Sequence, residues 1–223
     1  MTYIIPDTNV IVSASINYCF EEIGNIKHIH HDESYRLFNL ISQTASVRGI
    51  LLKKVNSECW GALLKALKDT ISEETTSRRL KEAYYENTNE ITFPFILEMV
   101  NLLQNLDYVE EFDTEQLNKS RQDVKSMVKE LEHSKDNSKQ LDRLREKSNT
   151  GDEEILAQSV TIKRSHRARD SHVLIASKDM GFFSPLGKSN TVTKRICDEF
   201  KIRCDHPDEI IRIVKGESKT KYC

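Results

Sequence analysis

The sequence predicts an α/β fold in which helices cover a parallel sheet of four or five strands. Short apolar runs alternate with longer amphipathic segments along the chain, which is the pattern of strand–helix–strand units. One run, residues 173–176, is wholly apolar, as is typical of a parallel strand that is buried on both faces. With 223 residues, the chain is long enough for one such domain with a core that needs no disulfides.

The first predicted strand and the first predicted amphipathic helix occupy the N-terminal region. The strand covers residues 3–5 and delivers Asp7 at its carboxyl end, before a turn into a short helix. Apolar side chains at mixed three- and four-residue spacings predict a helix over residues 33–44, which Gly49 ends.

A second strand, at residues 50–52, precedes a helix over residues 58–67, with Asn56 or Ser57 as its N-cap. The composition changes at residues 69–149, where Glu, Lys, Arg, Gln and Asn surround a thin apolar stripe. We expect two to four helices there, forming an insertion or arm.

The C-terminal region returns to alternating strands and helices. A capping box at Thr150 to Glu153 opens a helix through about residue 163. The later elements are predicted as a strand at 173–176, a helix at 192–200, an edge strand at 202–204 and a helix at 207–214. The domain prediction is therefore a discontinuous α/β domain, residues 1–68 and 150–223, with the helical insertion at 69–149.

Composition excludes several classes of protein. No apolar run approaches the roughly 20 residues that span a bilayer, and the N-terminus lacks the basic region of a secretion signal. The five cysteines are scattered without metal-ligand spacing, which argues against zinc and fits a reducing cytoplasm. The net charge of −2 argues against nucleic-acid binding by overall charge alone.

Four acids fall where a parallel sheet would bring them to one rim. Asp7 and Asp179 follow apolar runs, while Glu58 and Asp152 lie in the first turn of predicted helices. Ligands of open parallel sheets bind outside the carboxyl ends of the strands. Carboxylates without His or Cys favour Mg²⁺ or Mn²⁺, and such a metal can activate water and stabilise a phosphodiester in transition.

Three motifs, in this order, resemble the PIN-domain family. They are residues 4–11 (IIPDTNVI), residues 152–157 (DEEILA) and residues 174–182 (LIASKDMGF), with Glu58 between the first two. The resemblance implies a three-layer fold and a metal-dependent endoribonuclease. It assigns Asp7, Glu58, Asp152 and Asp179 as catalytic and metal-binding acids, and Thr8, Asn9 and Ser177 as groups that orient them through hydrogen bonds.

The chain departs from the family in two respects. Many relatives carry a further acid where this chain has Gly181, which favours one firmly held metal over two. The chain is also longer than the toxin members of toxin–antitoxin pairs, which argues against that role.

Each candidate residue also has an alternative interpretation. Glu73, Glu74 and Glu98 compete with Glu58, and Glu153 competes with Asp152. The basic run of Lys163, Arg164, Arg167 and Arg169 is either a solvated helix end or a contact for RNA phosphates.

Two functions from different classes remain open at this point. The first is cleavage of single-stranded or loop RNA by a carboxylate-bound Mg²⁺ or Mn²⁺. The second is a non-catalytic PIN-like module that binds RNA or a protein. The sequence does not identify the RNA, decide on DNA as a substrate, or decide whether a homodimer or an inhibitor protein is formed.

Overall fold

A computed structural model of the chain describes residues 1–24, 33–72, 88–109, 111–131, 151–165, 171–178 and 192–217. Its centre is a five-stranded sheet in which every neighbouring pair of strands is parallel, which confirms the predicted α/β class. The strands are β1 (Thr2–Pro6), β2 (Val47–Leu52), β3 (Asp107–Val109), β4 (His172–Ala176) and β5 (Arg203–Asp205).

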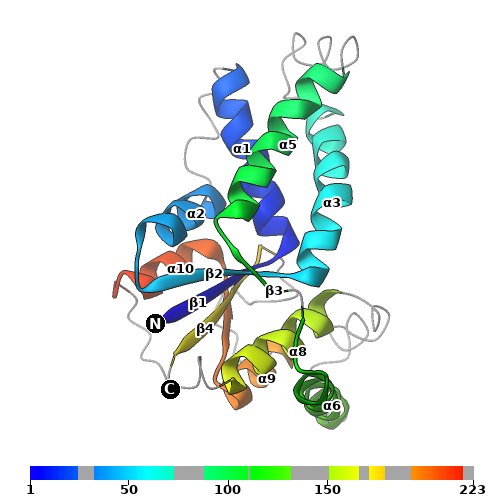
Figure 1. Cartoon of the computed structure of the whole chain (residues 1–223), viewed down its shortest axis with the longest axis vertical. Coiled ribbons are helices and arrows are strands. Elements are labelled where there is room, and N and C mark those ends of the chain that lie inside the picture. The colour runs from blue at the N-terminus through cyan, green and yellow to red at the C-terminus, as the bar shows by residue number, and fades with distance from the viewer. Residues whose placement is uncertain are drawn as a thin grey trace.

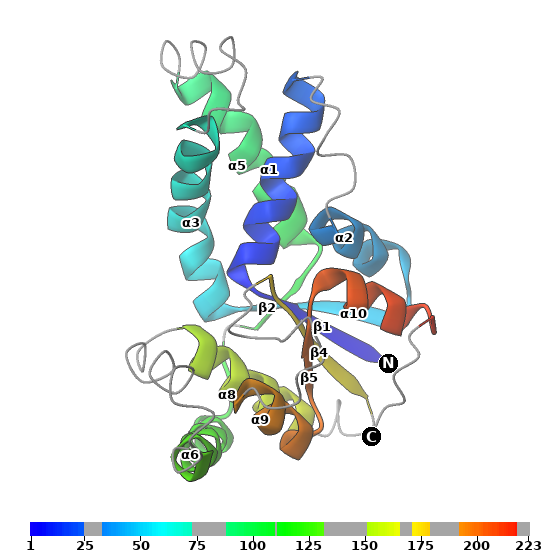
Figure 2. The same ribbon diagram turned by 180° about the vertical axis from the view of Figure 1, so that it is seen from behind.

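Helices cover both sides of this sheet. Figures 1 and 2 show α6, α8 and α9 on one side and α1, α2, α3, α5 and α10 on the other. Their bounds are α1 Thr8–Gly24, α2 Glu33–Gln43, α3 Lys53–Ser72, α5 Thr88–Gln104, α6 Thr114–Leu131, α8 Gly151–Arg164, α9 Val192–Phe200 and α10 Pro207–Val214. None of the helices in the described ranges is long and apolar enough to cross a membrane.

The order of the strands, β3-β2-β1-β4-β5, reverses between β1 and β4, and we call the rim outside the carboxyl ends of these two strands the crevice. The chain moves outward from β1 to β2 and β3, then returns to place β4 on the other side of β1. In such sheets, ligands bind where the order reverses, outside the carboxyl ends of the two central strands. Pro6 of β1 is in register with Ala176 of β4, so Asp7 and Ser177 leave the sheet side by side.

Part of the segment at 69–149 belongs to the same core as the rest of the domain. In α5, Phe95 and Met99 are buried and the helix packs on α1. The strand β3 extends the sheet beside β2. Of the described elements in this segment, α6 alone lies on the far side of the sheet, where it packs on α8. Within the described residues, the boundaries at 69 and 149 therefore do not separate two cores.

Three local expectations from the sequence were wrong. The helix after Asp7 is not short, because α1 runs for 17 residues, with Val10, Ile11 and Ala14 buried against its neighbours. Tertiary packing thus overrides the strand preference of the Val and Ile residues. The helix predicted from about residue 58 already begins at Lys53, because β2 leads into α3 without a loop.

Gly49 does not end a helix but lies inside β2. A Cβ atom there would meet the side chain of Leu106 at 2.3 Å and that of Ile41 at 2.9 Å. A larger residue would force these two side chains to shift, so glycine allows α2 and the residues after α5 to pack closely against this strand.

Candidate metal centre

Asp7 lies at the crevice between β1 and β4, and its carboxylate accepts hydrogen bonds from three groups. The backbone N–H of Asp7 donates to Ala176 O at 2.8 Å, which fixes it to the neighbouring strand. Its Oδ1 accepts from the Thr8 N–H at 2.6 Å, and its Oδ2 accepts from Asn9 Nδ2 and Ser177 Oγ, each at 2.8 Å. These partners are arranged for an ionised carboxylate, although the residue is only 7% exposed.

The pKa of Asp7 is raised from 3.8 to about 6 in spite of those donors. Burial is the largest cause, and the hydrogen bonds from Ser177 and Thr8 offset part of it. The charges of Asp152 and Glu58 raise the pKa further. Asp152 and Glu58 are therefore close enough to repel the charge of Asp7, and a bound cation would relieve that repulsion.

Glu58 is held at this crevice by a hydroxyl and an ammonium group. Thr8 Oγ1 donates to Glu58 Oε2 at 3.2 Å, and Lys54 Nζ lies 2.9 Å from Glu58 Oε1. Because α3 begins at Lys53, Glu58 is not in the first turn that the sequence predicted but in the second, where the helix dipole acts on it only weakly.

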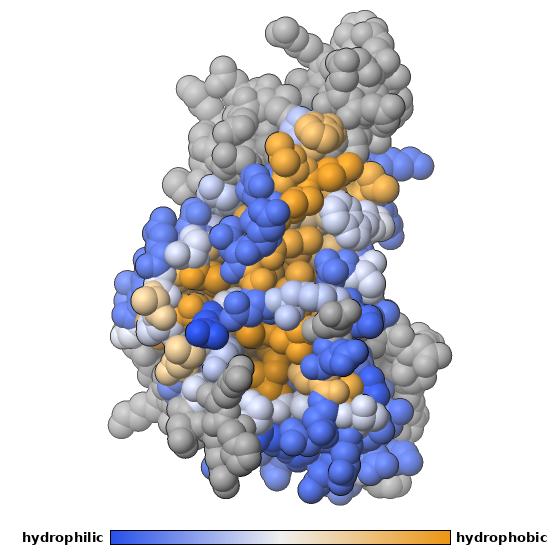
Figure 3. All heavy atoms as spheres, viewed as in Figure 1, coloured by the Kyte–Doolittle hydropathy of each residue, from blue (hydrophilic) through white to orange (hydrophobic). Residues whose placement is uncertain are grey.

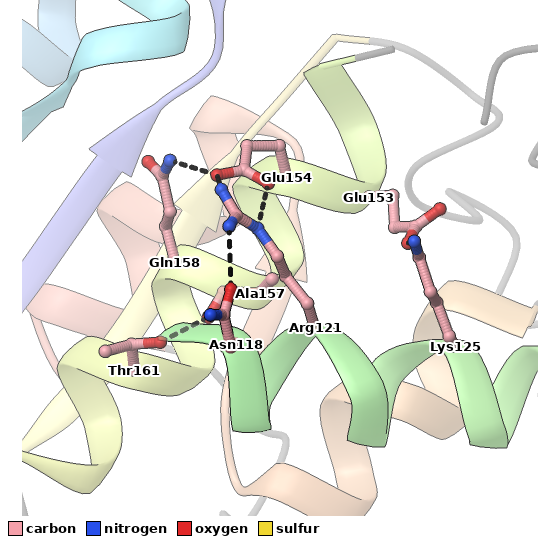
Figure 4. A network of polar contacts seen from close by, with 8 residues as sticks. All are labelled: Asn118, Arg121, Lys125, Glu153, Glu154, Ala157, Gln158 and Thr161. Carbon is pink, nitrogen blue, oxygen red and sulfur yellow. Dashed lines mark hydrogen bonds and ion pairs between the residues drawn. The ribbon is translucent and has the colours of Figure 1, made fainter. Parts of the chain in front are cut away.

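The first turn of α8 carries three consecutive acids, and the structure distinguishes between them. Arg121 and Gln158 engage Glu154, and Lys125 pairs with Glu153, as Figure 4 shows. The negative charge of Asp152 instead raises the pKa of Asp7. Of these three acids, Asp152 is thus the one whose charge acts on Asp7.

Other predicted residues are elsewhere or outside the described part of the chain. Five of them lie outside the described part: Asp179, which directly follows Lys178, and Arg167, Arg169, Glu73 and Glu74. Lys163 Nζ donates to the Ser171 carbonyl, while Arg164 binds Asp123 and Ser120 and lies over the Phe200 ring, so both are engaged within the protein. Glu98 lies on α5 and accepts from Asn101.

The donor chemistry of the crevice fits a hard divalent cation. Among the described residues, no three His, Cys, Asp or Glu side chains already converge as metal ligands. Asp7 Oδ1 accepts one hydrogen bond from those residues and has a second lone pair for a metal. Burial raises the pKa of the neighbouring Cys59 thiol to about 12, with Asp7 and Glu58 adding to it, so the available ligands are oxygens.

Removal of the Ser177 hydroxyl tests whether Asp7 must be oriented for metal binding. We expect Ser177→Ala to lower Mn²⁺ affinity by about 10- to 100-fold, because Asp7 Oδ2 loses one of its two donors. Titration calorimetry of the folded variant measures this directly. The Ser42→Ala variant removes an exposed serine hydroxyl from α2 and serves as the control; equal affinities for all three proteins would contradict the role of Ser177.

The contact between α6 and α8 includes one ion pair with two hydrogen bonds. Arg121 donates to both oxygens of Glu154, at 2.9 and 2.6 Å, and Gln158 Nε2 donates to the same carboxylate at 2.6 Å. Burial raises the pKa of Glu154, but these hydrogen bonds and the nearby cations outweigh it, so the pKa lies below its usual value. The network therefore favours the ionised form of Glu154.

We expect Arg121→Met to lower the free energy of unfolding by about 1 to 3 kcal/mol, since Glu154 would remain half-buried without its cation. Lys125→Met is the matched control, because its pair with Glu153 is longer, at 3.7 Å, and Lys125 is exposed. It should cost less than about 1 kcal/mol. Urea denaturation compares the two variants, and equal losses would contradict the special role of Arg121.

Three cations near the crevice were not singled out in the sequence. Lys54 was detectable, since it stands four residues before Glu58 on one helix face. Lys178 was not, because its ammonium group reaches Ser13 on α1 and Glu33 on α2, far away in the sequence. Arg121 likewise meets Glu154 across 33 positions.

Comparisons of this chain with models of protein families, with curated proteins and with solved structures found no match.

Proposed function

We propose that this protein is a PIN-like, Mg²⁺- or Mn²⁺-dependent endoribonuclease that hydrolyses single-stranded or loop RNA. The observation that carries the proposal is Asp7, a buried carboxylate at the reversal of the strand order, with donors on both oxygens and two further acids within electrostatic range. A buried acid with a strongly raised pKa in a crevice is a marker of a functional site.

In this proposal, Asp7, Glu58 and Asp152 hold the cation, and Asp179 completes the set from the segment after β4. Asn9 and Ser177 keep Asp7 in place, while Thr8 connects Asp7 with Glu58. When bound, the metal lowers the pKa of a water molecule and stabilises the charge on the phosphodiester. The fixed hydrogen bonds reduce the reorganisation needed when the metal and RNA arrive.

A second candidate is a non-catalytic module of the same fold that binds RNA or a protein. The observation that favours it is the lack of three convergent metal ligands in the described part of the chain. The two candidates differ in whether RNA is cut once a divalent cation is supplied.

Incubation of the full chain with labelled single-stranded RNA, with and without Mn²⁺, separates these candidates. The nuclease predicts shorter products on a denaturing gel that require Mn²⁺ and disappear with EDTA. RNA binding that Mn²⁺ strengthens, without any product, would support the non-catalytic module. A Mn²⁺ anomalous peak in a crystal would identify the ligands, including any contribution of Asp179.

A further inference from the structure

Two lysines lie on opposite sides of the first turn of α8, which carries Asp152. Lys54 on α3 pairs with Glu58, and Lys125 on α6 pairs with Glu153. Helix α8 contacts both α3 and α6. Both views show the start of α8 between the start of α3 and helix α6 (Figures 1 and 2). One ammonium group thus lies beside Glu58 on α3, and another lies beside Glu153 in the first turn of α8.

Both lysines can exchange their carboxylate for another anion at little cost. The side chain of Lys54 is 34% exposed and that of Lys125 is 60% exposed, and ion pairs with this degree of exposure stabilise proteins only weakly. The other cations nearby are held more firmly. Lys178 bridges Ser13 and Glu33, and Arg121 binds Glu154 through two hydrogen bonds.

The surface around α6 suits a sugar-phosphate backbone better than the surface around α5. Figure 3 shows hydrophilic residues over α6 and hydrophobic residues over α5, where Phe93 and Leu97 are exposed. The outward side chains of α6 include ammonium, amide and hydroxyl groups, which are the usual donors to phosphate oxygens. Besides Lys125, these are Gln116, Asn118, Lys119, Gln122, Ser126 and Lys129.

We propose that Lys54 and Lys125 contact two phosphates of one RNA strand, which crosses the first turn of α8 from α3 to α6. The strand would then pass over the acids, with one lysine on each side of the bond to be cut. Engagement of Glu58 by the metal would free Lys54 for its phosphate. This inference rests on the proposed function, and it adds the path of the substrate across the site.

The salt dependence of RNA binding tests this path. Fluorescence anisotropy of a labelled oligouridylate is measured in Ca²⁺ over a range of KCl, with a denaturing gel to show that the RNA remains intact. The variants are Lys54→Gln/Lys125→Gln and, as the control, Lys65→Gln/Lys68→Gln, which removes two exposed lysines farther along α3. Each lost phosphate contact should reduce the log–log salt slope by about 0.7, so the first variant should lose about 1.4 and the control nothing.

Metal affinity provides a second measurement. If Lys54 had a merely structural role, its loss would not raise the affinity for Mn²⁺. Because Lys54 competes with a cation for Glu58, Lys54→Gln should bind Mn²⁺ more tightly than the wild type while it binds RNA more weakly. An unchanged slope in Lys54→Gln/Lys125→Gln, or equal losses in both double variants, would overturn this path. Failure of the wild type to bind or cut RNA would overturn the proposed function instead.

Discussion

Asp7→Asn should reduce Mn²⁺-dependent RNA cleavage by more than about 100-fold, which is the largest effect that we expect from a single substitution. Residues that only orient metal ligands typically contribute 10- to 100-fold, and Asp7 is proposed as a ligand itself. Asparagine has the size of aspartate, and its carbonyl can still accept from the Thr8 N–H. The variant should therefore fold, but it supplies no negative charge to a cation.

Two controls make this result specific to the crevice. Asp107→Asn removes a carboxylate that also lies on a strand of the sheet, but at its exposed edge beside Arg48, and it should cleave at the wild-type rate. Circular dichroism should show the same helix and strand content in all three proteins. Cleavage that persists in purified Asp7→Asn would point to a contaminating nuclease and remove the support for the proposal.

The sequence predicted the parts of the crevice that depend on strand ends. Asp7 and Ser177 each follow an apolar run, and parallel strands bring their carboxyl ends to one rim, so their proximity needed no long-range information. Most helices and strands were predicted for a similar reason, since periodicity and turn residues are local signals. The same logic identified Asp152, which lies in the first turn of a helix on that rim.

The parts that could not be predicted depend on contacts between distant residues. The strand β3 has only three residues, Asp107 to Val109, and two of them are exposed, so no apolar run marks it. It forms because the edge of β2 offers unpaired backbone groups. The division of roles within the first turn of α8 was also hidden, because α6 supplies the cations that engage Glu153 and Glu154.

The stability of the metal-free protein should fall as the pH rises from 4 to 7, because Asp7 is buried. Its pKa is 3.8 in the unfolded chain and about 6 in the folded one. Between these values the folded state holds the proton more tightly, so this contribution is complete below pH 3.8 and is lost as the pH rises through 6. The free energy of unfolding of the wild type, relative to Asp7→Asn, should decrease by about 2 to 3 kcal/mol over this range.

A divalent cation should reverse this loss, since it takes the place of the proton on the carboxylate. Saturating Mn²⁺ at pH 7.5 should raise the melting temperature of the wild type by about 6 to 12 °C, the change that about 3 kcal/mol produces in a domain of this size. At pH 5 the proton competes with the metal, so the increase should be smaller. Thermal melts at both pH values measure this linkage without any RNA. An equal response of Asp7→Asn to Mn²⁺ would show that the cation binds elsewhere. The raised pKa of Asp7 would then be unrelated to metal binding.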